Sequence, residues 1–137
     1  MNRSIFAAGI FALVGCLSLG AQSIKLTATI PFEFRIGAHQ MPAGDYLVSH
    51  TSGVLTLRRE SGKYNAANVL VFGTRKGSNG TSSKLVFNRY GEDYFLANVW
   101  QAGEPTGLEV PKGKIEKEMA SRGPGPIQTA SVRLQAK

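Results

Sequence analysis

The sequence predicts an all-β protein, an antiparallel sandwich or small barrel of six to seven strands with a short C-terminal helix. Three observations lead to this fold class. Runs rich in β-branched and aromatic residues recur along the chain, and turn sequences separate them every eight to twelve residues or so. The first of these runs alternates apolar and polar residues with a period of two. Only a stretch near the C-terminus has the composition of a helix.

The first predicted strand segment covers residues 24–36. Polar residues occupy one face, and the other face is apolar, so one side is expected in the core and the other in water. The apolar positions are Ile24, Leu26, Ala28, Ile30, Phe32, Phe34 and Ile36. Pro31 has no backbone N–H, which predicts a sheet edge or a bulge at this point.

Three further segments follow in the middle of the chain. Met41–Tyr46 reads as a turn that enters the next strand, with proline at a position where its fixed φ is favourable. Residues 54–58 form a strand bounded by Ser-Gly pairs. Residues 66–72 are apolar on both faces apart from Asn68, which predicts a central strand. Residues 73–83 are rich in small polar residues and predict an exposed, mobile loop.

A hairpin is expected next. Residues 84–90 and 94–100 are rich in strand-forming residues, and the three residues between them include Gly91. Such a pair of runs joined by a short loop containing glycine is typical of a β-hairpin. Residues 108–110 predict one more short strand.

The pattern changes at Pro111. Residues 112–121 contain good helix formers and place Ile115 and Met119 four positions apart, which predicts a short helix docked on the sheet through a narrow apolar stripe. From residue 122 onward the chain has little to bury and predicts disorder. The expected organisation is a signal peptide over 1–23, a β-domain with its closing helix over 24–121, and a disordered tail over 122–137.

Residues 1–23 have the three parts of a secretory signal: a basic start, an apolar run and a small-residue cleavage region. The apolar run is short for a membrane span, which needs about 20 residues. The sequence Ala-Gln-Ser predicts cleavage after Ser23 and a secreted or periplasmic protein. The sequence Leu-Val-Gly-Cys also fits a bacterial lipobox, so the alternative is an outer-membrane lipoprotein that carries lipid on Cys16. A membrane partner is expected only in that alternative.

Cysteine content and charge restrict the function further. Cys16 is the only cysteine of the 137 residues, so a chain cleaved after Ser23 has neither disulfides nor a cysteine metal site or nucleophile. The net charge is +7, and Arg3 is the one charged residue of the predicted signal. Outside the cytoplasm such a charge suits an anionic envelope glycan or lipid headgroup. No dense run of basic residues occurs, so nucleic acid is not an expected partner.

No catalytic constellation is recognisable. His39 and His50 have no carboxylate or cysteine at metal-ligand spacing, whereas metal sites use three or four ligands. They are read as solvated residues near turns. No strained nucleophile turn and no phosphate-binding loop is present. The sequence therefore predicts neither an enzyme nor a metal or cofactor.

The best binding candidates are aromatic. Tyr94 and Trp100 fall on the same face of the hairpin, with Leu96 and Asn98 between them, and Arg89 lies nearby. An exposed face of this kind suits sugar rings or an anionic polymer. The alternative is that these rings form cross-strand pairs that cover the sheet or core.

Two stretches resemble a known signature. Residues 30–37, IPFEFRIG, and residues 41–48, MPAGDYLV, are similar to an IPFxFxVG…LPAGxYxV pattern found in a family of small secreted bacterial proteins of unknown function. Residues 85–91, Tyr94–Leu96 and Trp100 fit the same family, as does the closing helix. The resemblance implies export and a start of the first strand soon after the signal. It implies no activity.

The leading hypothesis is thus an exported, non-catalytic β-domain that binds or has a structural role at the cell envelope. A second hypothesis is a small β-barrel that carries an apolar ligand, in a cavity lined by residues such as Phe32, Phe34, Leu85 and Phe87. A third is a hydrolase whose carboxylates come together only in three dimensions.

Overall fold

The computed structural model describes residues 24–61, 66–74, 82–123 and 128–136. The predicted signal peptide, its cleavage after Ser23 and the lipidation alternative at Cys16 lie outside the described residues. Most of the loop predicted over residues 73–83 also lies outside the described residues. The single helix of the described ranges is too short and too polar to cross a membrane.

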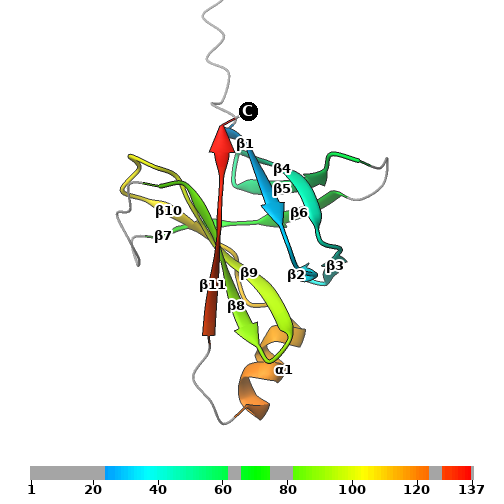
Figure 1. The fold of residues 1–137 in the computed structure, drawn as a ribbon. Helices are drawn as coiled ribbons and strands as arrows, with labels where there is room; N and C mark the ends of the chain where they lie inside the picture. Colours follow the sequence, from blue (N-terminus) through cyan, green and yellow to red (C-terminus); the bar gives the residue numbers. More distant parts are fainter. Residues whose placement is uncertain (1–23, 62–65, 75–81, 124–127, 137) are drawn as a thin grey trace, which may run out of the picture.

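Two β-sheets and one short helix make up the described chain, and no closed barrel forms (Figure 1). This confirms the predicted all-β sandwich with a C-terminal helix. The first sheet has the spatial order β12 (Gln135–Ala136), β1 (Ile24–Ile30), β4 (Gly44–Thr51), β5 (Val54–Arg59) and β6 (Ala66–Leu70). The second has the order β11 (Gln128–Arg133), β8 (Lys84–Tyr90), β9 (Asp93–Trp100), β10 (Gly107–Glu109) and β7 (Phe72–Thr74). The short β2 (Phe34–Ile36) joins the second sheet beside β9 and pairs with β3 (His39–Met41).

The inward-facing residues of the predicted segment 24–36 contribute to the core from both sheets, through β1 in the first sheet and β2 in the second. Leu26, Ala28 and Ile30 are buried on β1, as are Phe34 and Ile36 on β2. The ring of Phe34 contacts both Tyr46 of β4 and Phe87 of β8 edge to face, with centroids 5.2 and 5.4 Å apart. Because such aromatic contacts add to the burial of apolar area, this cluster ties the two sheets together. The Tyr46 hydroxyl donates a hydrogen bond to the carbonyl of Pro42.

Strands that pass from one sheet to the other join both edges of the sandwich. β6 continues into β7 through Val71, and β11 continues into β12 through Leu134. Both crossover residues are buried, and each N–H donates to a carbonyl 2.9 Å away, from Val71 to Gly53 and from Leu134 to Ser83. The chain therefore seals the core at both edges, as strands do when they switch sheets at the corners of a sandwich. The described chain has twelve short strands, more than the six to seven predicted. Some predicted strands are divided, as β1 from β2 and β6 from β7, and β3 and β11 fall where no strand was predicted.

The prediction of a disordered tail is wrong for residues 128–136. β11 pairs with β8 over six residues, and its Ala130 and Val132 pack against the core. Together with Leu134 these residues place three apolar side chains at alternate positions, which is the pattern of a strand. The glycine- and proline-rich composition just before them concealed this short alternation.

The prediction of a central strand over 66–72 is also wrong. β6 lies at the end of its sheet, and the side chains of Leu70 and Phe72 are 65% and 61% exposed. The run is apolar on both faces because its inward positions, such as Ala67 and Val71, line the corner of the sandwich. The apolar residues on either side of Val71, Leu70 and Phe72, point outward where the chain crosses between the sheets.

The helix α1 (Lys114–Arg122) lies beside the hairpin end of β8 and β9 (Figure 1). It docks there mainly through the carboxylate of Glu116. Its most buried residue is Glu116, which is only 4% exposed, and Ile115 and Met119 of the predicted apolar stripe are only half-buried. The Oε2 atom of Glu116 accepts hydrogen bonds from Asn88 Nδ2 at 3.0 Å and from the Tyr90 hydroxyl at 2.9 Å. A carboxylate in the first turn of a helix is also favoured by the helix dipole.

The contact with the helix changes the acidity of Tyr90. Burial raises the pKa of this tyrosine from 10.0 to about 12, and the hydrogen bond to Glu116 and the negative charge of Glu116 add to the effect. A folded-state pKa above the ordinary value means that the folded protein holds this proton more tightly than the unfolded chain. The associated stability is fully present below pH 10 and is lost as the pH rises towards 12.

Replacement of the crossover residue tests the docking of the C-terminal segment. We expect Leu134→Ala to lower the free energy of unfolding by about 2–5 kcal/mol, since it leaves a cavity in the core. The neighbouring exposed Gln135→Ala should change it by no more than about 0.5 kcal/mol. Urea unfolding of the two variants measures both values. Equal midpoints for the two variants would show that residues 128–136 are not docked.

A pH titration tests the contact between Tyr90 and the helix. The difference in ultraviolet tyrosinate absorbance between the parent protein and Tyr90→Phe should follow one ionisation with a midpoint near 12. Tyr46, whose pKa is also raised by burial, is present in both proteins and cancels in the difference. The unfolding free energy of the parent should fall more steeply than that of the variant between pH 10 and 12. A midpoint near 10 would contradict the buried contact.

Candidate functional site

A β-bulge separates the aromatic residues predicted to form a binding face. In the β8–β9 pairing Tyr94 lies opposite Arg89 and Trp100 lies opposite Lys84, but the extra residue Ala97 of β9 has no partner in β8. One inserted residue reverses the alternation of a strand. The prediction that Tyr94 and Trp100 share one face is therefore wrong: Tyr94 lies on the core side of the sheet and Trp100 on the other side.

Neither ring is available as an exposed platform. The ring of Tyr94 stacks on Phe32 with centroids 3.8 Å apart and an interplanar angle of 14°. The guanidinium carbon of Arg89 lies 5.4 Å from the Tyr94 centroid, within the range of a cation–π contact. Trp100 is only 6% exposed. Arg89 and Tyr94 are thus brought together without Trp100, and both rings contribute to packing.

Trp100 instead covers the backbone of Gly107. In the β9–β10 register Leu108 pairs with Val99, next to Gly107 and Trp100, and a Cβ atom built on this glycine would clash with Cε3 of the indole. Only a residue without a side chain permits so close an approach. This contact fixes the base of the loop 101–106 that connects β9 to β10.

Two hydrogen bonds also hold the loop 101–106 in place. The Glu104 N–H donates to the carbonyl of Gln101 at 3.1 Å, and Gly103 between them has a φ of +82°. A type II turn requires a positive φ at its third position, and glycine adopts it without strain. The Ala102 N–H donates to Ser83 Oγ at 2.9 Å. The side chains of this loop are therefore presented on a fixed backbone.

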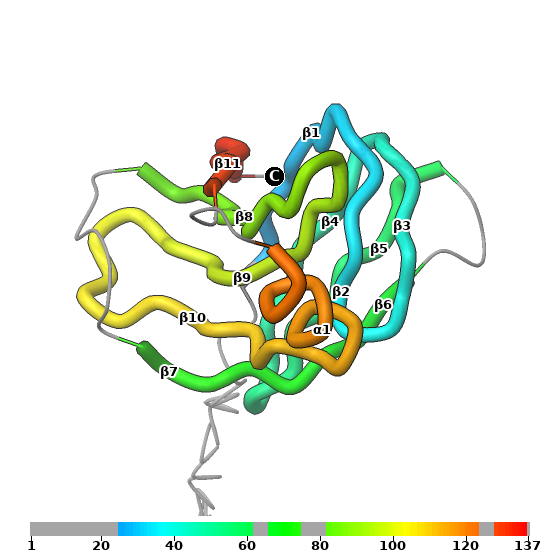
Figure 2. Tube along the Cα trace, turned by 90° about the horizontal axis from the view of Figure 1, so that it is seen from below, coloured from blue at the N-terminus to red at the C-terminus, as the bar shows by residue number. Residues whose placement is uncertain are grey.

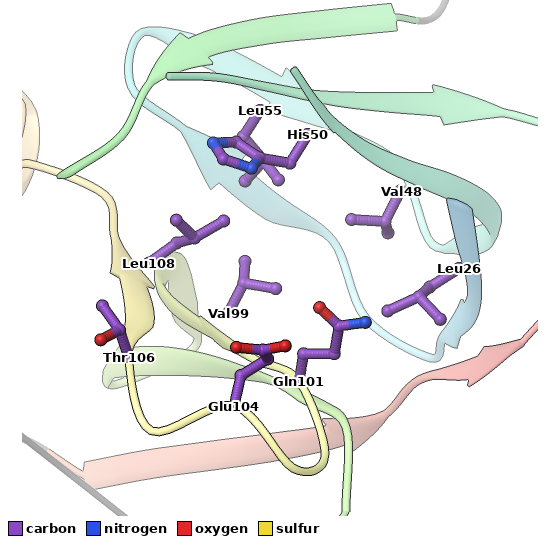
Figure 3. Close-up of a pocket in the computed structure, with 9 residues that line it drawn as sticks. All are labelled: Leu26, Val48, His50, Leu55, Val99, Gln101, Glu104, Thr106 and Leu108. Atoms are coloured by element: carbon purple, nitrogen blue, oxygen red, sulfur yellow. The ribbon is translucent and has the colours of Figure 1, made fainter. Parts of the chain in front are cut away.

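A cavity of about 310 Å³ lies between the two sheets next to this loop (Figure 3). Strands β1, β4, β5, β9 and β10 provide its walls, and the loop after β9 provides its polar side. The residues that line it are Leu26, Val48, His50, Leu55, Val99, Gln101, Glu104, Thr106 and Leu108. In Figure 3, His50 and Leu55 lie across the cavity from Gln101 and Glu104.

The lining combines an apolar wall with a polar mouth. Five aliphatic side chains form the wall, while Glu104 and Thr106 are exposed and Gln101 is half-buried, which places these three at the mouth. Glu104 is the one carboxylate of the lining, no lysine or arginine belongs to it, and its other ionisable side chain is His50. This arrangement suits a ligand that has an apolar body and a cationic or hydrogen-bond-donating head.

Sequence reasoning missed this cavity. His50, interpreted as a solvated residue near a turn, is half-buried and belongs to the lining. The aliphatic residues of the wall are those of the predicted core. The available signal was the polar segment 101–106 between two strands, but its position opposite β4 depends on how the sheets pack.

A second group of acidic residues borders only a small hollow. Glu33, Glu92 and Asp93 surround a hollow of about 40 Å³ at the β8–β9 turn. Among the described residues, no three histidine, aspartate or glutamate side chains gather closely enough to hold a metal ion.

Comparisons with known proteins supply no relative. No family model matches the chain, and neither curated proteins nor solved structures give a match. The resemblance of residues 30–37 and 41–48 to the secreted bacterial family therefore stays a prediction.

The close contact between Trp100 and Gly107 is testable by adding one methyl group. We expect Gly107→Ala to lower the free energy of unfolding by about 1–3 kcal/mol, because its Cβ must displace the indole. Gly123→Ala is the matched control, since its Cβ would meet its nearest neighbour, the Met119 carbonyl, at 3.7 Å. Thermal unfolding monitored by tryptophan fluorescence compares the two. A Gly107→Ala variant as stable as the control would contradict this packing.

Proposed function

We propose that this chain is an exported, non-catalytic binding domain that acts at the cell envelope and takes a small amphiphilic ligand into the cleft between its sheets. The observation that carries the proposal is the cavity of about 310 Å³ with an apolar wall and Glu104 at its mouth. Binding sites for small molecules are commonly concave, mostly apolar and equipped with a few polar groups, with volumes from about 300 Å³ upward.

The chemistry of the lining defines the ligand class. The apolar body of a ligand would lose water against Val48, Leu55 and Val99, and such burial contributes about 25 cal/mol for each Å² of apolar surface. Glu104 favours an ammonium group or another donor at the mouth, and the Gln101 amide offers both an acceptor and donors. The proposed ligand is therefore a small cationic amphiphile.

The basic charge of the chain supports a separate part of the proposal. A net charge of +7 favours approach to an anionic glycan or lipid headgroup at the envelope. The carboxylate of Glu104, with no lysine or arginine in the lining to offset it, disfavours an anionic group at the mouth of the cleft. The two properties together suit a basic domain that stays near an anionic surface and binds a cationic ligand in its cleft.

The alternative hypotheses gain less support. The carrier hypothesis also requires a cavity, but it placed the ligand among Phe32, Phe34, Leu85 and Phe87. The last three are buried in the core, and Phe32 is packed against it. The hydrolase hypothesis requires two carboxylates across a cleft that can hold a substrate. Glu104 is the only carboxylate that lines the 310 Å³ cavity, and the hollow beside Glu33, Glu92 and Asp93 is far smaller.

The charge preference of the cleft provides the test. Isothermal titration calorimetry of the full chain should give a Kd for n-hexylamine roughly fivefold lower than for hexanoate, as expected for an exposed ion pair of about 1 kcal/mol. Glu104→Gln should abolish this preference. Glu109→Gln, which alters an exposed carboxylate of β10 outside the cavity lining, is the matched control and should retain it.

A second variant separates binding in the cleft from binding elsewhere. Thr106→Trp places a large side chain at the mouth without changing the core, and it should weaken the binding of both compounds. Equal affinity of the parent protein for the amine and the acid would contradict the proposed ligand class. Unchanged binding to Thr106→Trp would contradict the proposed site.

A further inference from the structure

The strand that crosses between the sheets at Val71 presents an unusual edge. In the described residues, β6 pairs with β5 on one side and has no strand on the other. The two most exposed large apolar side chains of the described chain, Leu70 and Phe72, flank the crossover. Natural edge strands are commonly protected by charged residues or proline. None of the nine residues from Ala66 to Thr74 is charged, and none is proline.

A groove of about 390 Å³ runs along this open edge. One side of it is formed by Asn68–Leu70 of β6. The other side is formed by residues 36–39, from the turn between β2 and β3, and by Pro111–Gly113, which lead into α1. Figure 2 shows β6 on the same side of the molecule as β3 and the start of α1.

The groove has an electrostatic preference opposite to that of the cleft. Its lining contains Lys112 and His39, both exposed, and no acidic residue. The positive charge of Lys112 favours an acidic group on whatever occupies the groove. The backbone N–H and C=O groups on the open side of an edge strand are satisfied best by another extended backbone.

We propose that the open edge of β6 binds an extended segment of another protein, in which apolar side chains alternate with acidic ones. The segment adds a strand to β6, its apolar side chains cover Leu70, and its carboxylates lie beside Lys112. A second copy of this chain is a poorer occupant, because each copy brings a net charge of +7 and its own edge, Ala66 to Thr74, has no acidic residue to pair with Lys112. This site is independent of the cleft.

Synthetic peptides test the inference on the full chain. A ten-residue peptide of alternating valine and glutamate should bind, and one of alternating valine and lysine should bind at least tenfold more weakly, measured by fluorescence anisotropy. Amide hydrogen exchange should slow at Asn68–Leu70 in the presence of the acidic peptide. Replacement of alternate peptide residues by proline, which removes the N–H donors, should abolish binding.

Two variants localise the effect. Leu70→Lys, at a position 65% exposed and so expected to fold normally, should weaken binding of the acidic peptide at least tenfold. Lys112→Glu should reverse the preference between the two peptides, and Lys117→Glu, on the exposed side of α1, is its matched control. Absence of binding by either peptide, or protection at residues other than those of β6, would overturn the proposal. So would a dimer in sedimentation that Leu70→Lys dissociates, since the edge would then be occupied by a second copy.

Discussion

The sharing of strands between the two sheets is the constraint on which the rest of the structure depends. Val71 and Leu134 carry the chain across opposite edges, and each buries its side chain and donates its N–H to a carbonyl of a neighbouring turn or strand end. A sandwich joined in this way cannot slide one sheet over the other without breaking those contacts. The separation of the sheets at the cavity is therefore fixed by the same residues that close the core.

Polar groups determine what each open part of the structure can bind. The loop 101–106 is held at its base by the Trp100–Gly107 contact and presents Glu104 to an aliphatic cavity. The groove along the open edge of β6 is lined by Lys112 and by no acidic residue. The two surfaces therefore differ both in the sign of their charge and in their shape, since one is a cavity for a small molecule and the other a groove beside a strand.

The fold class could be predicted from the sequence because it depends on local patterns, such as the alternation of residues 24–36 and the glycine-containing turn after Tyr90. The errors have a common physical origin in long-range pairing. Ala97 looks like any strand residue, yet its insertion as a bulge turns Trp100 away from Tyr94. The sequence suggests that Glu116 is a solvated helix residue, because its hydrogen-bond donors Asn88 and Tyr90 lie far from it along the chain. The cavity could not be predicted, because its lining comes from five strands and a loop.

A crystal structure of the full chain soaked with n-hexylamine tests the central claim most directly. The account predicts that the ammonium group lies within hydrogen-bond distance of the Glu104 carboxylate and that the alkyl chain lies against Val48 and Leu55 between the sheets. A cavity filled by its own side chains, or an amine bound only outside it, would contradict the assignment of this cleft as the ligand site.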